Sequence, residues 1–132
     1  MNKNDIAKLI LRVVLGLTFF IHGLVKFQGG IANTAGYFDS LGIPGFMAYV
    51  VATIELLGGL AMIIGIGTKI VGILFAIIML GAIFIAKLSL GFLGNGQMAG
   101  YELDVILLAA SVYFVLADRS VLSADYKLAN KG

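Results

Sequence analysis

The chain carries an unbroken apolar run, FMAYVVATIELLGGLAMIIGI at residues 46–66, with one charged residue, Glu55, near its middle. An apolar run of about 20 residues is long enough to cross a bilayer as an α-helix. At about 1.5 Å per residue, the Glu55 carboxylate would lie roughly 13–16 Å from either end of such a helix, close to the bilayer midplane. A charge at that depth costs about 2.5–3.5 kcal/mol even on scales derived from membrane insertion. The run therefore predicts a membrane-spanning helix in which Glu55 needs a compensating partner.

The composition of the whole chain is that of an integral membrane protein. Hydrophobic residues make up 61% of its 132 residues and charged residues 12%, against about 45–50% and about 25% in soluble domains. The mean hydropathy is +1.07. The net charge of +2 comes from basic residues in the connections between apolar runs and indicates no nucleic-acid surface. The chain has no Cys and one His, which excludes a disulfide, a Cys-ligated iron–sulfur or zinc site, and a haem held by two His of one subunit. We expect no metal site.

Four apolar spans account for most of the chain, which we expect to form a single domain over residues 1–132. The spans cover residues 6–26, 46–66, 70–87 and 101–117. A short turn at residues 67–69 joins the second span to the third and makes them antiparallel neighbours. The predicted fold is an all-α integral membrane protein, an antiparallel four-helix transmembrane bundle.

The distribution of basic residues predicts the orientation of these spans. Seven of the nine Lys and Arg residues lie on one side: Lys3, Lys8, Arg12, Lys69, Arg119, Lys127 and Lys131. Lys26 and Lys87 lie on the other. The positive-inside rule then predicts a multi-pass protein of the cell membrane with its N- and C-termini in the cytoplasm. The basic start of the chain is also typical of a signal peptide, but no small-residue cleavage site follows, so we expect the first span to be retained.

The two connections on the opposite side differ in kind. The first contains a short helix, which we expect to begin at Asn33 or Thr34 and to end at Gly42. Tyr37 would place its ring at the membrane interface, over the mouth of the bundle. The second connection, at residues 88–100, contains four glycines and is predicted to be a mobile loop.

One face of the first span carries a stripe of four residues, Arg12, Phe19, His22 and Lys26, within about 80° of one another at about 100° per residue. We expect this stripe to face the bundle, because lipid would penalise its polar members. Arg12 and His22 lie about 15 Å apart along the axis, on either side of the expected depth of Glu55, so each is a candidate partner for it. The alternative for Arg12 is snorkelling to the headgroups. The alternative for His22 is a hydrogen bond to a backbone carbonyl at the interface.

Two acidic residues, Glu102 and Asp104, begin the fourth span. Acidic residues in a first turn complement the helix dipole, which accounts for Glu102. The two side chains point about 160° apart, so we expect only one of them to face a central cavity. We choose Asp104, because it shares a face with Ser111 and thirteen uncharged residues follow it. Lys87, at the end of the third span, lies on the same side and is a candidate partner for either acid.

The chain resembles the DoxX family of small four-span membrane proteins. The motifs that carry the resemblance are LRVVLGLTFFIHG at 11–23 with KF at 26–27, TAGYF at 34–38, LGIP at 41–44, IELLGG at 54–59, GIGT at 65–68, YELD at 101–104 and DR at 118–119. Within the family the chain looks most like the short CatD- and MhqP-type membrane oxidoreductases, associated with catechol and quinone stress in Gram-positive bacteria. The resemblance implies a membrane redox role in the detoxification of catechols or quinones. Arg12, His22, Glu55 and Glu102 stand at matching motif positions.

The leading interpretation is therefore a quinone-linked oxidoreductase or its membrane subunit, in which a lipid-soluble ring enters the bundle. The candidates for proton relay or for contact with the ring oxygens are Glu55, His22 and Arg12. The candidates for substrate binding are Phe19, Tyr37, Glu102 and Asp104. No side chain supplies electrons, so they would come from a soluble oxidoreductase partner or from a bound cofactor, which the sequence does not identify beyond quinone itself.

Two other interpretations stay open. The chain could be a non-catalytic membrane anchor or assembly factor for a soluble redox enzyme, with Glu55 and Arg12 holding helices together. A less favoured interpretation is a small transporter of phenolic compounds. Four spans are few for that role unless the protein forms a homo-oligomer.

Overall fold

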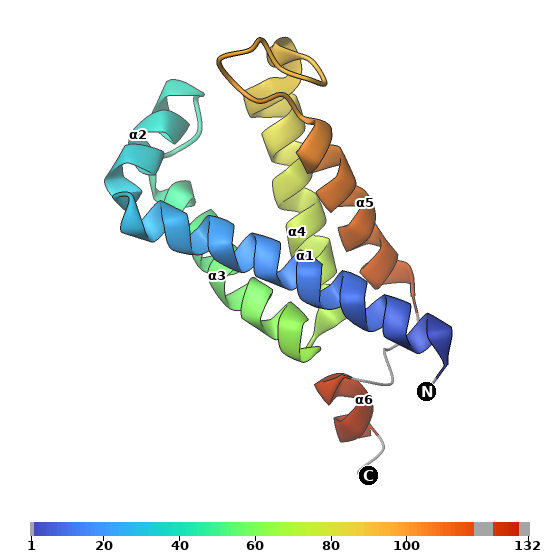
Figure 1. Ribbon diagram of the computed structural model, residues 1–132. Helices are drawn as coiled ribbons and strands as arrows, with labels where there is room; N and C mark the ends of the chain where they lie inside the picture. Colours follow the sequence, from blue (N-terminus) through green and yellow to red (C-terminus); the bar gives the residue numbers. More distant parts are fainter. Residues whose placement is uncertain (1, 118–122, 130–132) are drawn as a thin grey trace.

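The computed structural model describes residues 2–117 and 123–129 and is built from helices (Figure 1). The helices are α1 (Lys3–Gln28), α2 (Ile31–Ser40), α3 (Phe46–Ile64), α4 (Thr68–Gly81), α5 (Glu102–Leu116) and α6 (Ala124–Ala129). A π-helical segment, η1 (Ala82–Lys87), and a 3₁₀ turn, η2 (Leu88–Leu90), extend α4. The predicted all-α class is confirmed. Arg119, Lys131 and the motif at 118–119, which entered the sequence interpretation, lie outside the described residues.

Three segments of the described chain are long and apolar enough to cross a membrane: Lys3–Gln28, Phe46–Ile64 and Thr68–Leu90. They coincide with the first three predicted spans. The fourth predicted span is observed as α5, which has 15 residues. At about 1.5 Å per residue it is about 22 Å long, shorter than the hydrocarbon core of about 30 Å. The four-span bundle therefore stays a prediction.

The helices form two packed pairs. α1 packs along α3, and α4 packs along α5, with fewer contacts between the pairs. The aromatic rings of Phe19 on α1 and Phe75 on α4 connect the two pairs, because they stack at a centroid distance of 3.7 Å. The start of α1, the α3–α4 turn and α6 lie at one end of the molecule, and α2 lies at the other (Figure 1). From the turn that joins them, α3 and α4 diverge.

Glycines set the distance between α1 and α3. A Cβ atom on Gly16 would lie 2.7 Å from the carbonyl oxygen of Gly59, and one on Gly23 would lie 2.7 Å from the amide nitrogen of Leu56. Both positions are too close for any side chain, so the two backbones touch there. This contact fixes which residues of α1 face which residues of α3.

The connection before α3 begins differently from the prediction. α2 begins at Ile31, with Gly30 at its N-cap in a left-handed conformation (φ +94°). The Asn33 side chain, expected to cap the helix, instead donates a hydrogen bond back to the Gly29 carbonyl at 3.2 Å. The earlier start is possible because Gly30 adopts a positive φ without strain.

The second connection is shorter than the predicted loop, because η1 and η2 carry the helix to Leu90. The remaining residues, 91–100, fold back on themselves. Asn95 accepts hydrogen bonds from the amides of Gln97 and Met98 at 3.1 and 2.8 Å, and an isolated bridge joins Gly94 to Ala99.

Candidate functional site

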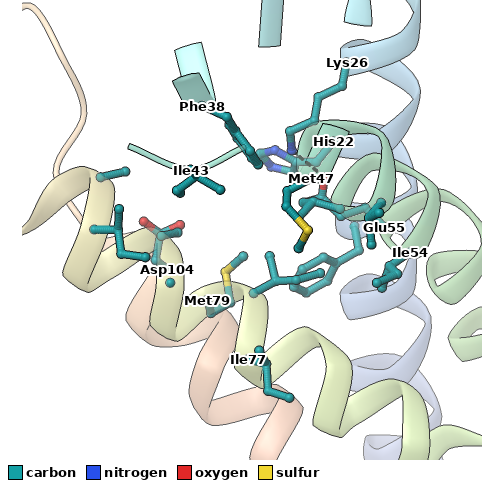
Figure 2. Close-up of a pocket in the computed structure, with 18 of the residues that line it drawn as sticks. His22, Lys26, Phe38, Ile43, Met47, Ile54, Glu55, Ile77, Met79 and Asp104 are labelled. Carbon is teal, nitrogen blue, oxygen red and sulfur yellow. Dashed lines mark hydrogen bonds and ion pairs between the residues drawn. The ribbon is translucent and has the colours of Figure 1, made fainter. Parts of the chain in front are cut away.

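A pocket of about 460 Å³ lies between the two helix pairs, at the α2 end of the molecule (Figure 2). Most of its lining is apolar and comes from α1, α2, α3, α4, η1 and α5. Its polar lining residues are His22, Lys26, Tyr37, Glu55, Lys87 and Asp104. The volume lies within the range of about 300–1,000 Å³ that is typical of small-molecule sites. A largely apolar wall with a few polar groups is also typical of such sites.

Glu55 forms an ion pair with Lys26 at this pocket. The Glu55 side chain is 3% exposed and the Lys26 side chain 25%. A Cβ atom on Gly23 would lie 3.1 Å from the Cβ of Glu55, so Glu55 leaves α3 beside Gly23. Lys26 lies about one turn further along α1, in its last turn, and reaches the carboxylate from there. The compensating partner that the sequence required is therefore a lysine.

Neither of the two predicted partners, His22 and Arg12, is paired with Glu55, although His22 lines the same pocket. The prediction placed Glu55 midway between Arg12 and His22 in depth, but the glycine contact slides α3 along α1, so that Glu55 faces Gly23. His22 lines the pocket from an exposed position. Within the described chain, the structure shows no hydrogen bond or ion pair between His22 and Glu55.

Arg12 is buried at the opposite end of the molecule, outside the pocket. Its Nη2 donates a hydrogen bond to the Ile63 carbonyl at 3.3 Å, and its Cζ would lie 3.1 Å from a Cβ on Gly65. Asp125 of α6 also interacts with it electrostatically. Arg12 thus links α1 to the α3–α4 turn and to α6. The expected contact between Arg12 and Glu55 is not formed.

A second ion pair joins η1, the extension of α4, to α5. Lys87 Nζ lies 2.9 Å from Asp104 Oδ2, and the acid is again the more buried partner. Asp104 and Ser111 are both buried on α5, as their predicted common face requires. Glu102 is exposed and lies outside the pocket lining. The structure therefore brings Asp104, the chosen acid, to the cavity together with Lys87.

Lys87 is the last residue of the π-helical segment η1, and its side chain reaches Asp104 of α5 from there. A π turn holds more residues than an α-helical turn, so it changes the face from which Lys87 leaves the helix. Segments of this kind are often found at functional sites.

Aromatic residues line the pocket between the two ion pairs. Phe19 is buried against Phe75. Tyr37 and Phe38 of α2 line the pocket at the α2 end of the molecule, and Tyr37 is exposed. Of the sequence candidates, the structure thus gathers Phe19, His22, Tyr37, Glu55 and Asp104 at one cavity.

Two lysines at the pocket, Lys26 and Lys87, were not among the candidate site residues. A sequence signal existed for Lys26, which follows Phe19 by seven residues on the same stripe. Within the described residues, no group of three or more His, Cys, Asp or Glu side chains is arranged to hold a metal ion.

Long apolar helices around a largely apolar, ion-paired pocket define a membrane protein with a candidate small-molecule site. Residues 7–88 match the model of the DoxX family, and the chain belongs to that family. The matched region includes Lys26, Glu55 and Lys87 and ends before Asp104.

The relatives of the chain include several that cover most of its length. A Bacillus subtilis (strain 168) protein named "Putative oxidoreductase CatD" is 46% identical over 126 residues, which cover 95% of this chain and 90% of that protein. "Uncharacterized membrane protein Rv3486" of Mycobacterium tuberculosis is 27% identical over 131 residues, with 92% and 80% coverage. "Inner membrane protein YqjF" of Escherichia coli (strain K12) is 35% identical over 65 residues, 49% of each chain. No solved structure matches the chain significantly.

Proposed function

We propose that the chain binds a quinone or catechol ring in the pocket and takes part in its redox chemistry, as an oxidoreductase or as its membrane subunit. The observation that carries the proposal is the pocket itself. An apolar, aromatic-lined cavity has a lysine–carboxylate pair on the α1–α3 side and another on the α4–α5 side. The name of the Bacillus subtilis relative supports a redox role.

The lining suits an oxygen-bearing ring. Tyr37 and Phe38 offer aromatic surfaces, which pack favourably against another ring, and the buried Phe19 borders the pocket. The Nζ groups of Lys26 and Lys87 are donors for quinone oxygens, and the carboxylates of Glu55 and Asp104 are acceptors for phenol hydroxyls. A ring between the two pairs would thus find a donor and an acceptor on each side in either redox state.

Reduction of a quinone to its hydroquinone consumes two electrons and two protons. Each ion pair holds a proton on its lysine next to a buried carboxylate, and positioned groups of this kind act as general acids and bases. In this proposal Lys26–Glu55 serves one ring oxygen and Lys87–Asp104 the other. The electrons come from a reductant outside the chain's own side chains, delivered by a soluble oxidoreductase partner or by a bound cofactor.

The orientation in the membrane is part of the proposal. The end of the molecule that holds the α3–α4 turn and α6 carries four lysines: Lys3, Lys8, Lys69 and Lys127. We place this end in the cytoplasm, as the positive-inside rule requires. α5 would complete the bundle as a fourth, short span. Because the chain has no Cys, single cysteines at Lys3 and Gln97 would report the sidedness by labelling with an impermeant maleimide.

A non-catalytic anchor is the second candidate, because each ion pair also holds two helices together. Binding separates the candidates. The protein in lipid nanodiscs would be titrated with 2,3-dimethoxy-5-methyl-1,4-benzoquinone and with catechol. We expect Glu55→Gln and Asp104→Asn to weaken binding about tenfold each, whereas Glu102→Gln, an exposed acid outside the pocket, keeps the affinity of the unmodified chain. Unchanged affinity in the two pocket variants would contradict the proposed site and favour the anchor.

A further inference from the structure

The pocket lies where α3 and α4 separate. The two helices run in opposite directions from the turn at residues 65–67, so residues equally distant from Ile66 lie at about the same distance from the turn. Ile54 and Ile78 form one such pair and Met47 and Ile85 another, and all four residues line the pocket. The helices diverge from the turn (Figure 1), so the space between them widens towards the α2 end.

Side chains on both edges of this space line the pocket and also lie on the outer surface of the molecule. Val50 of α3 is 41% exposed, and Ile77 of α4 and Ile85 of η1 are 60% and 52% exposed. A residue that meets both the cavity and the surface marks a place where the wall is open. α3 and α4 belong to segments apolar enough to cross a membrane, so this opening would face hydrocarbon once these segments span a bilayer.

Gly81 lies at the centre of the α4 edge. Ile77, Gly81 and Ile85 are spaced four residues apart and form one row along the helix. Gly81 lines the pocket, and a Cβ atom built on it would meet no atom within 4 Å. The row therefore has a gap where a side chain would otherwise stand.

We propose that the gap between α3 and α4, bordered by Val50, Ile77, Gly81 and Ile85, is a lateral portal through which a ligand with a lipid tail enters the pocket from the bilayer. The proposal rests on the proposed function and narrows its ligand class. The ring lies between the two ion pairs, and the apolar tail leaves through the portal into the lipid. Tyr37 and Phe38 lie over the other route, at the α2 end.

The test blocks the portal without touching the ion pairs. Gly81 has helical angles (φ −61°, ψ −44°), so Gly81→Phe adds a ring at the gap without backbone strain. Gly36→Phe is the matched control, because Gly36 is also helical and has open space around it, yet does not line the pocket. Two probes would be titrated into phosphatidylcholine nanodiscs: 2,3-dimethoxy-5-methyl-1,4-benzoquinone and the same ring with a decyl chain at position 6.

We expect Gly81→Phe to weaken binding of the decyl probe about tenfold more than binding of the tailless ring, whereas Gly36→Phe alters neither. Gly81→Leu, with a smaller side chain, repeats the test if the Phe variant does not fold, as judged by its melting temperature. Equal effects of the portal variant on both probes, or none on either, would overturn the portal and leave the proposed function standing. If the unmodified protein binds neither probe, the proposed function fails and the portal with it.

Discussion

Lys26, in the last turn of α1, forms an ion pair with Glu55, the single charged residue of α3. The pairing follows from the contact of α1 and α3 at Gly23, which sets Glu55 about one turn below the lysine. Glu55 is nearly inaccessible, whereas Lys26 is partly exposed at the end of its helix. Removal of the Lys26 charge and removal of the Glu55 charge should therefore affect the stability of the protein differently.

Substitution of Lys26 by Met should destabilise the protein more than Glu55→Gln. The first change leaves a buried carboxylate without its cation, a situation that costs about 3–5 kcal/mol. The second removes the buried charge, and Lys26 extends towards the headgroups. Thermal unfolding in detergent, followed by circular dichroism, should rank Lys26→Met lowest and the double variant above it. Equal melting temperatures for Lys26→Met and Glu55→Gln would contradict the burial of the Glu55 carboxylate on which this prediction rests.

The α1–α3 contact should tolerate no side chain at Gly23. Its Cβ would lie 2.7 Å from a backbone nitrogen and 2.8 Å from a backbone oxygen of α3, so Gly23→Ala forces the helices apart. Overpacking of this kind costs about 1–3 kcal/mol. Gly36→Ala is the control, because it meets open space and gains helix propensity. A Gly23→Ala protein as stable as the Gly36→Ala protein would rule out the close contact.

Asp125 should stabilise the α3–α4 turn from α6. Its Oδ1 and Oδ2 accept hydrogen bonds from the amides of Gly67 and Thr68, at 3.0 and 3.3 Å, at the start of α4. Loss of an N-terminal cap typically costs about 0.5–2 kcal/mol. Asp125→Ala should lower the melting temperature and expose α6 to limited proteolysis, whereas Lys127→Gln, on the exposed side of the same helix, should do neither. Identical cleavage rates for the two variants would contradict the capping role.

Much of the fold follows from hydropathy alone. The three apolar runs coincide with α1, α3 and the α4 segment, and the common face of Asp104 and Ser111 was predicted from helical period. Lys87 was recognised as a partner for one of the two acids, because it ends the neighbouring span on the same side. These features depend on local periodicity, which the sequence displays directly.

The partner of Glu55 could not be predicted, because it depends on the axial register of two helices. Gly16, Gly23 and Gly59 set that register through backbone contact, and nothing local in the sequence distinguishes this register from one shifted by a turn. The π-helical turn at η1 could not be predicted either, since its sequence, AIFIAK, contains no Gly or Pro to mark an irregular turn. Arg12 meets Asp125 only because α6 returns to the start of the bundle, a contact between the two ends of the chain.

The most direct measurement of the central claim, that an oxygen-bearing ring lies between the two ion pairs, is photoaffinity labelling with an azido-benzoquinone, mapped by peptide mass spectrometry. The account predicts labels on pocket residues such as Met47, Ile54, Met79 and Leu107, and their loss when an excess of unlabelled quinone is present. Labels spread evenly over exposed apolar residues outside the pocket, such as Ile10 and Ile106, and undiminished by competitor would contradict it.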